Sequence, residues 1–170
     1  MQPEKLIELL KLKPLLPEGG YYRQTYISSG RFDSNCLPSG YGSQHPYGTA
    51  IFYLLTCAPN SFSAIHRLPG DEIYHFYLGD PVDMLLLYPD GMGEIVRLGQ
   101  DIMSGQLVQK VVPAGVWQGA RLVSGGFSAL MGTTMAPGFL PEDYVPGKRL
   151  QLIETYPSFA ANIESLSERE

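Results

Sequence analysis

The stretch SFSAIHRLPGDEIYHFYLG, residues 61–79, decides the fold that this sequence predicts. Its two halves are rich in apolar and aromatic residues, as β-strands are, and a Pro-Gly turn separates them. His66 lies in the first half, and Glu72 and His75 lie in the second. Because side chains alternate along a strand, a hairpin can bring His66 and Glu72 together. His75 is expected on the opposite face unless a β-bulge re-aims it.

Further strand-like runs flank this stretch on both sides. Turn residues separate them, for example Pro-Asp-Gly at 89–91 and Ser-Gly-Gly at 124–126. Many short strands with no helix between them predict an all-β fold, an antiparallel sandwich or barrel. The expected strands are 21–28, 50–57, 61–68, 72–78, 82–88, 94–98, 107–112, 116–123 and 127–134.

Helices are expected only near the two ends of the chain. Residues 3–13 carry apolar side chains at helical spacing, with Pro3 in the first turn and Pro14 as the stop. A short C-terminal helix is expected over residues 158–166. The long polar stretch 30–48 predicts a lid or binding loop, which we expect near the mouth of a pocket.

Composition and charge narrow the class of protein. The 170 residues are 44% hydrophobic and 17% charged, which favours one globular domain over residues 1–170 and not a disordered chain. The net charge is −5, with no cluster of Lys and Arg, so a nucleic-acid partner is not expected. No run approaches the roughly 18 consecutive apolar residues of a membrane span, so no membrane partner is expected.

The two cysteines, Cys36 and Cys57, bear on the cellular compartment. The N-terminal apolar segment is interrupted by Glu4 and Glu8, so it lacks the apolar core of a secretion signal. We therefore expect a cytoplasmic protein in which both thiols are free.

A second stretch, VVPAGVWQGAR at residues 111–121, contains a Pro-x-Gly turn that leads into a strand. Together the two stretches resemble the paired motifs of the cupin superfamily, G-x5-H-x-H-x3–4-E-x6-G and P-x-G-x2-H. In that resemblance His66 falls on the first histidine and Glu72 on the glutamate. Leu68 and Gln118 stand where the other two metal-binding histidines would be.

Longer blocks in the same order resemble one branch of that superfamily, an uncharacterised RmlC-like cupin family (domain of unknown function 985). The resemblance covers most of the chain. It implies a cupin double-stranded β-helix, a jelly-roll barrel, usually assembled as a homodimer, and it implies no specific reaction. The matching blocks are LLPEGGYYRQTY (15–26), AIFYLLT (50–56), HRLPGDEIYHFYLGDP (66–81), LLLYPDG (85–91), VVPAGVWQGARL (111–122) and APGF (136–139).

The incomplete motif bears on metal binding. Divalent metals want three or four N, O or S ligands, and only His66 and Glu72 remain, so no metal or other cofactor is expected. Gln118 would offer a weak carbonyl ligand, and His75 could join only through a bulge. Glu72 can instead orient a protonated His66 for general acid–base catalysis. A buried ion pair that fixes strand register is the alternative.

Three functions stay open from the sequence. The first is a metal-independent isomerase or epimerase acting on a small polar metabolite such as a sugar derivative. His66 would be its base, Glu72 would orient that base and Tyr74 would be the acid, by analogy with sugar epimerases of this fold. The second is a metal-dependent enzyme with an incomplete ligand set, and the third is a non-catalytic small-molecule binding protein. The side chains expected to contact the ligand are Gln118, Arg23 and His75. For the arginine, a salt bridge at the surface or at an interface is an equal alternative.

Overall fold

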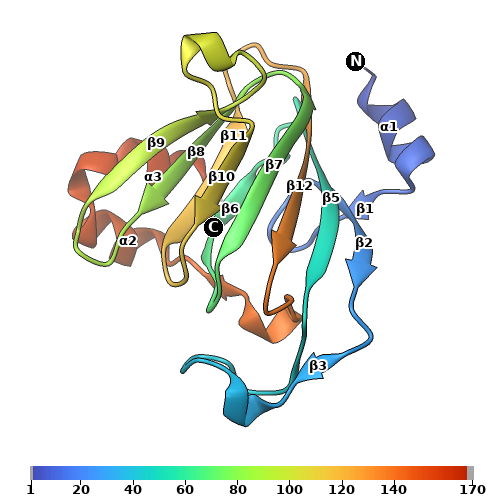
Figure 1. Ribbon diagram of the computed structural model, residues 1–170. Coiled ribbons are helices and arrows are strands. Elements are labelled where there is room, and N and C mark those ends of the chain that lie inside the picture. Colours follow the sequence, from blue (N-terminus) through green and yellow to red (C-terminus); the bar gives the residue numbers. More distant parts are fainter. Residues whose placement is uncertain (1, 168–170) are drawn as a thin grey trace.

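The computed structural model describes residues 2–167, and most of its regular secondary structure is β-strand (Figure 1). The expected domain, 1–170, includes residue 1 and residues 168–170, which lie outside the described part. The helices are α1 (Pro3–Leu10), α2 (Arg149–Thr155) and α3 (Ala160–Ser165). The strands are β1 (Lys13–Pro14), β2 (Tyr21–Ile27), β3 (Arg31–Phe32), β4 (His45–Pro46), β5 (Thr49–Thr56), β6 (Ser63–Arg67), β7 (Glu72–Gly79), β8 (Val82–Leu87), β9 (Gly93–Leu98), β10 (Gln109–Val112), β11 (Trp117–Leu122), β12 (Ser128–Met135) and β13 (Val145–Pro146).

Two antiparallel sheets face each other and form the barrel. The first has six strands in the order β1-β2-β5-β12-β7-β10, and the second has five in the order β13-β6-β11-β8-β9. β3 and β4 form a separate two-stranded pair. The predicted all-β jelly roll with short terminal helices is confirmed, because each long strand matches an expected run to within a few residues.

The helices differ from the sequence prediction in two places. α1 ends at Leu10, because Lys11 takes a left-handed backbone (φ 52°) and its N–H bonds back to the last turn. The prediction of a helix up to residue 13 was therefore too long. α2 was not predicted at all: its seven residues span about two turns, too few for a helical period to stand out. The expected C-terminal helix is present, as α3.

The connection between β6 and β7 corrects the expected hairpin. β6 pairs with β11 and β13, whereas β7 pairs with β12 and β10. The Pro-Gly turn therefore carries the chain from one sheet to the other. His66 and Glu72 still line one cavity, but they reach it from different sheets.

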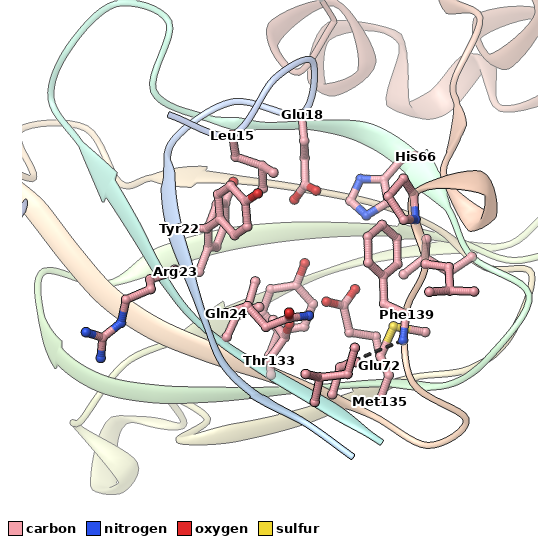
Figure 2. A pocket seen from close by; sticks show the side chains of 18 of the residues that line it. Leu15, Glu18, Tyr22, Arg23, Gln24, His66, Glu72, Thr133, Met135 and Phe139 are labelled. Carbon is pink, nitrogen blue, oxygen red and sulfur yellow. Dashed lines mark hydrogen bonds between the residues drawn. The ribbon is translucent and has the colours of Figure 1, made fainter. Parts of the chain in front are cut away.

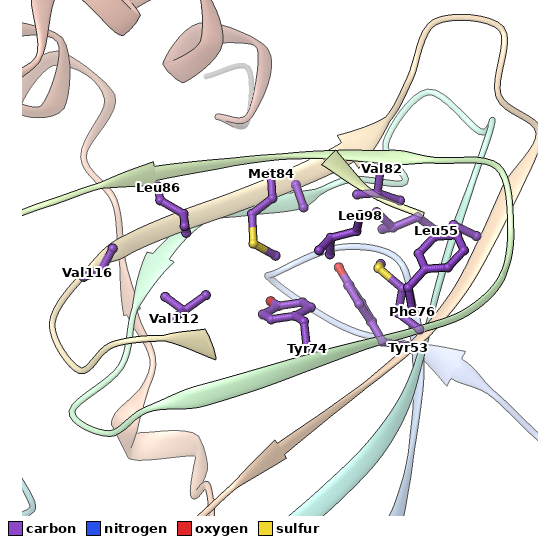
Figure 3. Packing of buried hydrophobic residues seen from close by; sticks show 13 residues of the cluster. Tyr53, Leu55, Tyr74, Phe76, Val82, Met84, Leu86, Leu98, Val112 and Val116 are labelled. Carbon is purple, nitrogen blue, oxygen red and sulfur yellow. The ribbon is translucent and has the colours of Figure 1, made fainter. Parts of the chain in front are cut away.

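The space between the sheets is filled by a core of apolar side chains (Figure 3). Tyr53 comes from β5, Tyr74 and Phe76 from β7, and Met84 and Leu86 from β8. Full burial of side chains of this size stabilises the fold by about 1.5–3 kcal/mol each. This core therefore holds the two sheets together.

The outer faces of the two sheets are covered unequally. α2 and α3 pack on the five-stranded sheet, where Leu152 and Ile163 meet Ile65 and Leu85 (Figure 1). On the six-stranded sheet, the cluster around Leu54 and α1 covers only one part of the outer face.

Two expectations about the chain as a whole are addressed by the structure. Cys36 and Cys57 are free, as predicted, and both are exposed. Within the described residues, no helix combines the length and the apolar character needed to cross a membrane.

Candidate functional site

A cavity of about 490 Å³ lies between the sheets and is walled by both of them (Figure 2). The six-stranded sheet contributes β2, β5, β7 and β12, and β6 contributes His66 from the other side. Two connections complete the wall. The one between β1 and β2 supplies Glu18, and the one after β12 supplies Phe139, Leu140 and Pro141.

His66 presents a neutral imidazole to this cavity. Its side chain is buried, and Nδ1 lies 2.8 Å from the carbonyl oxygen of Ala64. A carbonyl oxygen only accepts, so Nδ1 carries a proton, and in the neutral ring the lone pair is on Nε2. Burial lowers the pKa of His66, although Glu72 and the bond to Ala64 act in the other direction. Nε2 is therefore a base ready to accept a proton near pH 7. The ring is held by stacking on Tyr144, with centroids 4.9 Å apart.

Glu72 lies at the start of β7 and is buried. Its Oε2 accepts a hydrogen bond of 2.8 Å from Nε2 of Gln118. Burial raises the pKa of Glu72 and the Glu18 carboxyl raises it further, whereas His66 and the bonds from Thr133 and Gln118 lower it. The carboxyl is thus held in place while its charge is disfavoured.

Gln118 does not line the cavity as expected for a ligand contact. It is 2% exposed and lies behind Glu72, to which its amide nitrogen donates. Its Oε1 is buried with no hydrogen-bond partner among the described residues. The residue therefore positions Glu72, and its contact with a ligand is indirect.

Two tyrosines place phenol groups at the cavity. Tyr74 and Tyr53 are each 1% exposed and belong both to its wall and to the core. The Tyr53 hydroxyl donates to the carbonyl oxygen of Gly19 at 3.1 Å. Burial, aided by the nearby carboxyls, raises the pKa of both phenols well above 10. Both phenols therefore stay protonated, and Tyr74 keeps a hydroxyl hydrogen that it can donate.

Glu18 is a site residue that the sequence analysis missed. Its Oε1 accepts a 2.9 Å hydrogen bond from the hydroxyl of Ser63, and its backbone oxygen accepts from the N–H of Ala64 at 2.7 Å. Burial raises the pKa of Glu18 to about 7, against the lowering effect of Ser63. The available signal was an acidic residue enclosed by apolar residues and glycines in LLPEGGYY (15–22), but no motif marks it.

The remaining two expected ligand contacts lie elsewhere. His75 is on the outer face of the six-stranded sheet, where Nε2 bonds to the Thr134 hydroxyl at 3.0 Å and Nδ1 to Gln109 at 3.3 Å. The backbone of β2 places Arg23 beside the cavity, but its guanidinium lies 5.4 Å over the ring of Phe52 and points away (Figure 2). Neither expected contact is supported by this geometry.

The side chains at the motif positions do not fit the metal site of the superfamily. Leu68 offers no donor, and Gln118 turns its amide nitrogen, which cannot bind a cation, toward Glu72. Across residues 2–167, no three His, Cys, Asp or Glu side chains cluster as a metal site would require. The expectation that the protein binds no metal stays a prediction, but no step of a mechanism can be assigned to a metal here.

An ion pair lies behind the segment at the cavity mouth. Asp143 accepts from Nε2 of His45 at 3.0 and 3.1 Å, and both side chains are buried. Asp143 also accepts from the N–H of Leu140, which lines the cavity. The stretch 30–48 thus lies behind the mouth, as support for residues 139–144, and does not itself line the cavity.

Comparisons with known proteins agree with this fold. The sequence profile of the family described as Cupin superfamily (DUF985) matches residues 4–145, and the chain belongs to this family. An uncharacterised protein of Saccharomyces cerevisiae is 30% identical over 137 residues, which cover 75% of this chain. That match spans only 66% of the yeast protein, just under two thirds.

Solved structures extend the comparison. A hypothetical protein from Leishmania major superposes with a TM-score of 0.87 at 28% identity, covering 99% of this chain and all of that one. A protein of Shewanella oneidensis gives 0.85 at 30% identity, with full coverage of both chains. An oxalate decarboxylase of Bacillus subtilis gives 0.54 at 14% identity over 95% of this chain and 39% of its own, which shows a shared fold alone.

Proposed function

We propose that this cupin binds a small polar metabolite in the cavity and catalyses a metal-independent proton transfer on it, as an isomerase or epimerase does. The observation that carries the proposal is the pairing of a base and an acid in one buried site. His66 has its Nε2 lone pair available, and Tyr74 retains its phenolic proton. Such a reaction needs a general base and a general acid, and their surroundings must give them different pKa values.

Each of four residues has its own role in the proposed reaction. Nε2 of His66 removes a proton from a carbon next to a carbonyl group, and the imidazolium that forms is stabilised by Glu72. Tyr74 donates its hydroxyl hydrogen toward the intermediate and can complete the transfer to it. Gln118 holds Glu72 in place through the 2.8 Å hydrogen bond. The substrate loses one proton to His66 and gains one from Tyr74. The enzyme is reset when the His66 imidazolium releases its proton to water and the Tyr74 phenolate takes one up from water.

We also propose that the protein acts as a homodimer in the cytoplasm. The incomplete cover of the six-stranded sheet supports the dimer, and two free exposed thiols suit a reducing compartment. A non-catalytic binding protein uses the same cavity and differs only in the absence of turnover.

A metabolite screen by thermal shift tests the proposal, followed by proton NMR of each hit in D2O. A ligand at about 100 times its Kd stabilises the fold by about 2.7 kcal/mol. We expect a hit that exchanges a carbon-bound hydrogen for deuterium with the wild type and not with His66→Gln. His75→Gln, on the outer face, is the control and should retain exchange. Binding without exchange would identify a binding protein, and a screen without hits would contradict both.

A further inference from the structure

Two carboxyl groups from separate parts of the chain are directed into the same cavity (Figure 2). Glu18 enters from the connection between β1 and β2, and Glu72 enters from β7 on the facing wall. Each is anchored by a neutral donor, Ser63 at 2.9 Å for Glu18 and Gln118 at 2.8 Å for Glu72. Both orientations are thus fixed before any ligand enters.

No cation of the protein neutralises this pair within the described cavity wall. Burial lowers the pKa of His66 and thereby favours its neutral form, although Glu72 and the bond to Ala64 act in the other direction. Lys13 holds its Nζ 5.1 Å from the ring centroid of Tyr22, and Arg23 turns to the outer face. Glu72 is buried and Glu18 is half-buried. A carboxylate in such surroundings is costly without a positive partner or several hydrogen bonds, so the arrangement has a place for a cationic group.

The rest of the wall suits an organic cation. Tyr53 and Tyr74 add aromatic rings to the wall, whose faces attract a positive charge, while the ring of Tyr22 already has Lys13 over it. Apolar side chains follow toward the connection after β12: Leu68, Met135 and Phe139. The cavity therefore joins an acidic, aromatic part to an apolar part.

We propose that the ligand is an organic amine, whose protonated nitrogen is bound by Glu18 and Glu72 and whose apolar part packs against Leu68, Met135 and Phe139. This inference rests on the proposed function and deepens it by naming the ligand class. Ammonium-to-carboxylate hydrogen bonds are charge-assisted and stronger than those to a neutral hydroxyl. An alcohol of the same shape should bind the same walls more weakly.

Three probes of one shape test the charge preference: benzylamine, benzyl alcohol and benzoate. Calorimetric titration of the full chain at pH 8 should show benzylamine binding at least ten times more tightly than the other two. Glu18→Gln and Glu72→Gln should each weaken benzylamine binding about tenfold or more and leave benzyl alcohol binding unchanged. Glu142→Gln, an exposed acid behind the mouth, is the matched control and should change neither.

The pH dependence provides a test that needs no variant. Glu18, with a pKa of about 7, gains a proton between pH 8 and pH 6, while benzylamine stays charged. Affinity should therefore fall about tenfold over this range. The other ionisable residues that line the cavity are Lys13, Tyr22, Arg23, Tyr53, His66, Glu72 and Tyr74. The phenols of Tyr53 and Tyr74 do not titrate here, and protonation of Glu72 or His66 would act in the same direction.

Equal or tighter binding of benzyl alcohol or benzoate would overturn the amine inference and leave the proposed function standing. Benzylamine affinity that changes neither with pH nor in either variant would have the same effect. A metabolite screen with no hits, together with tight benzylamine binding, would contradict the proposed function and leave the amine inference standing. Circular dichroism of each variant checks that lost binding is not lost folding.

Discussion

At the scale of single residues, Glu18 makes the strongest electrostatic prediction. Its pKa is about 7 in the folded protein against an ordinary value of 4.5, so the folded state binds more protons between these values. The free energy of unfolding due to Glu18 therefore falls as pH rises from about 4.5 to about 7, by at most about 3 kcal/mol. Glu72 acts in the same direction, and His66, whose pKa is lowered, opposes it.

Glu18→Gln should remove this contribution. We expect the variant to gain stability relative to wild type as pH rises from 5 to 8, measured by urea denaturation at each pH. Glu154→Gln, an exposed acid on α2, serves as control and should follow wild type. Parallel stability curves for wild type and Glu18→Gln would contradict the assignment.

The residues of the site differ in how far the sequence predicts them. His66, Glu72 and Tyr74 lie in a motif whose strand alternation sets the side that each faces. Glu18 lies in a connection whose path is fixed by tertiary contacts, such as the bond from Ala64, that leave no local pattern. Whether Gln118 touches a ligand or Glu72 depends on a single hydrogen bond that no spacing encodes.

At the scale of elements, the segment 139–144 links the cavity wall to His66. Residues 139–141 line the cavity, and Tyr144 stacks on His66. The His45–Asp143 pair ties this segment to the stretch 30–48, across 98 residues of sequence. Most strands could be predicted from the sequence, because the alternation of side chains is a local pattern. The pairing of His45 with Asp143 could not, because the two residues lie far apart in the sequence. The seven-residue α2 was too short for its helical period to be recognised.

Asp143→Ala should loosen the cavity mouth. The substitution leaves His45 buried without its acceptor and removes the bond to the Leu140 N–H, so we expect a loss of about 3 kcal/mol in unfolding free energy. Urea denaturation measures this, and hydrogen exchange should quicken first at residues 139–144. Glu142→Ala, the exposed neighbour, is expected to change stability little. Unchanged exchange in Asp143→Ala would rule out the anchoring role.

At the scale of the whole molecule, the uneven cover of the two sheets bears on assembly. On the six-stranded sheet, Tyr26, Tyr77 and Val111 are 56%, 42% and 46% exposed. Phe52 lies among them, with its ring 6.0 Å from that of Tyr77. Aromatic and β-branched side chains that gather on one face are typical of a protein interface.

We therefore expect a homodimer that pairs through this face. Sedimentation at micromolar concentration should show a dimer for the wild type and a monomer for Val111→Asp, because a buried, unpaired carboxylate would oppose association. Ile95→Asp is the matched control: Ile95 is 49% exposed, but it lies on β9 in the other sheet. It should remain a dimer. A wild-type monomer would end the proposal, and dissociation by Ile95→Asp alone would move the interface to the five-stranded sheet.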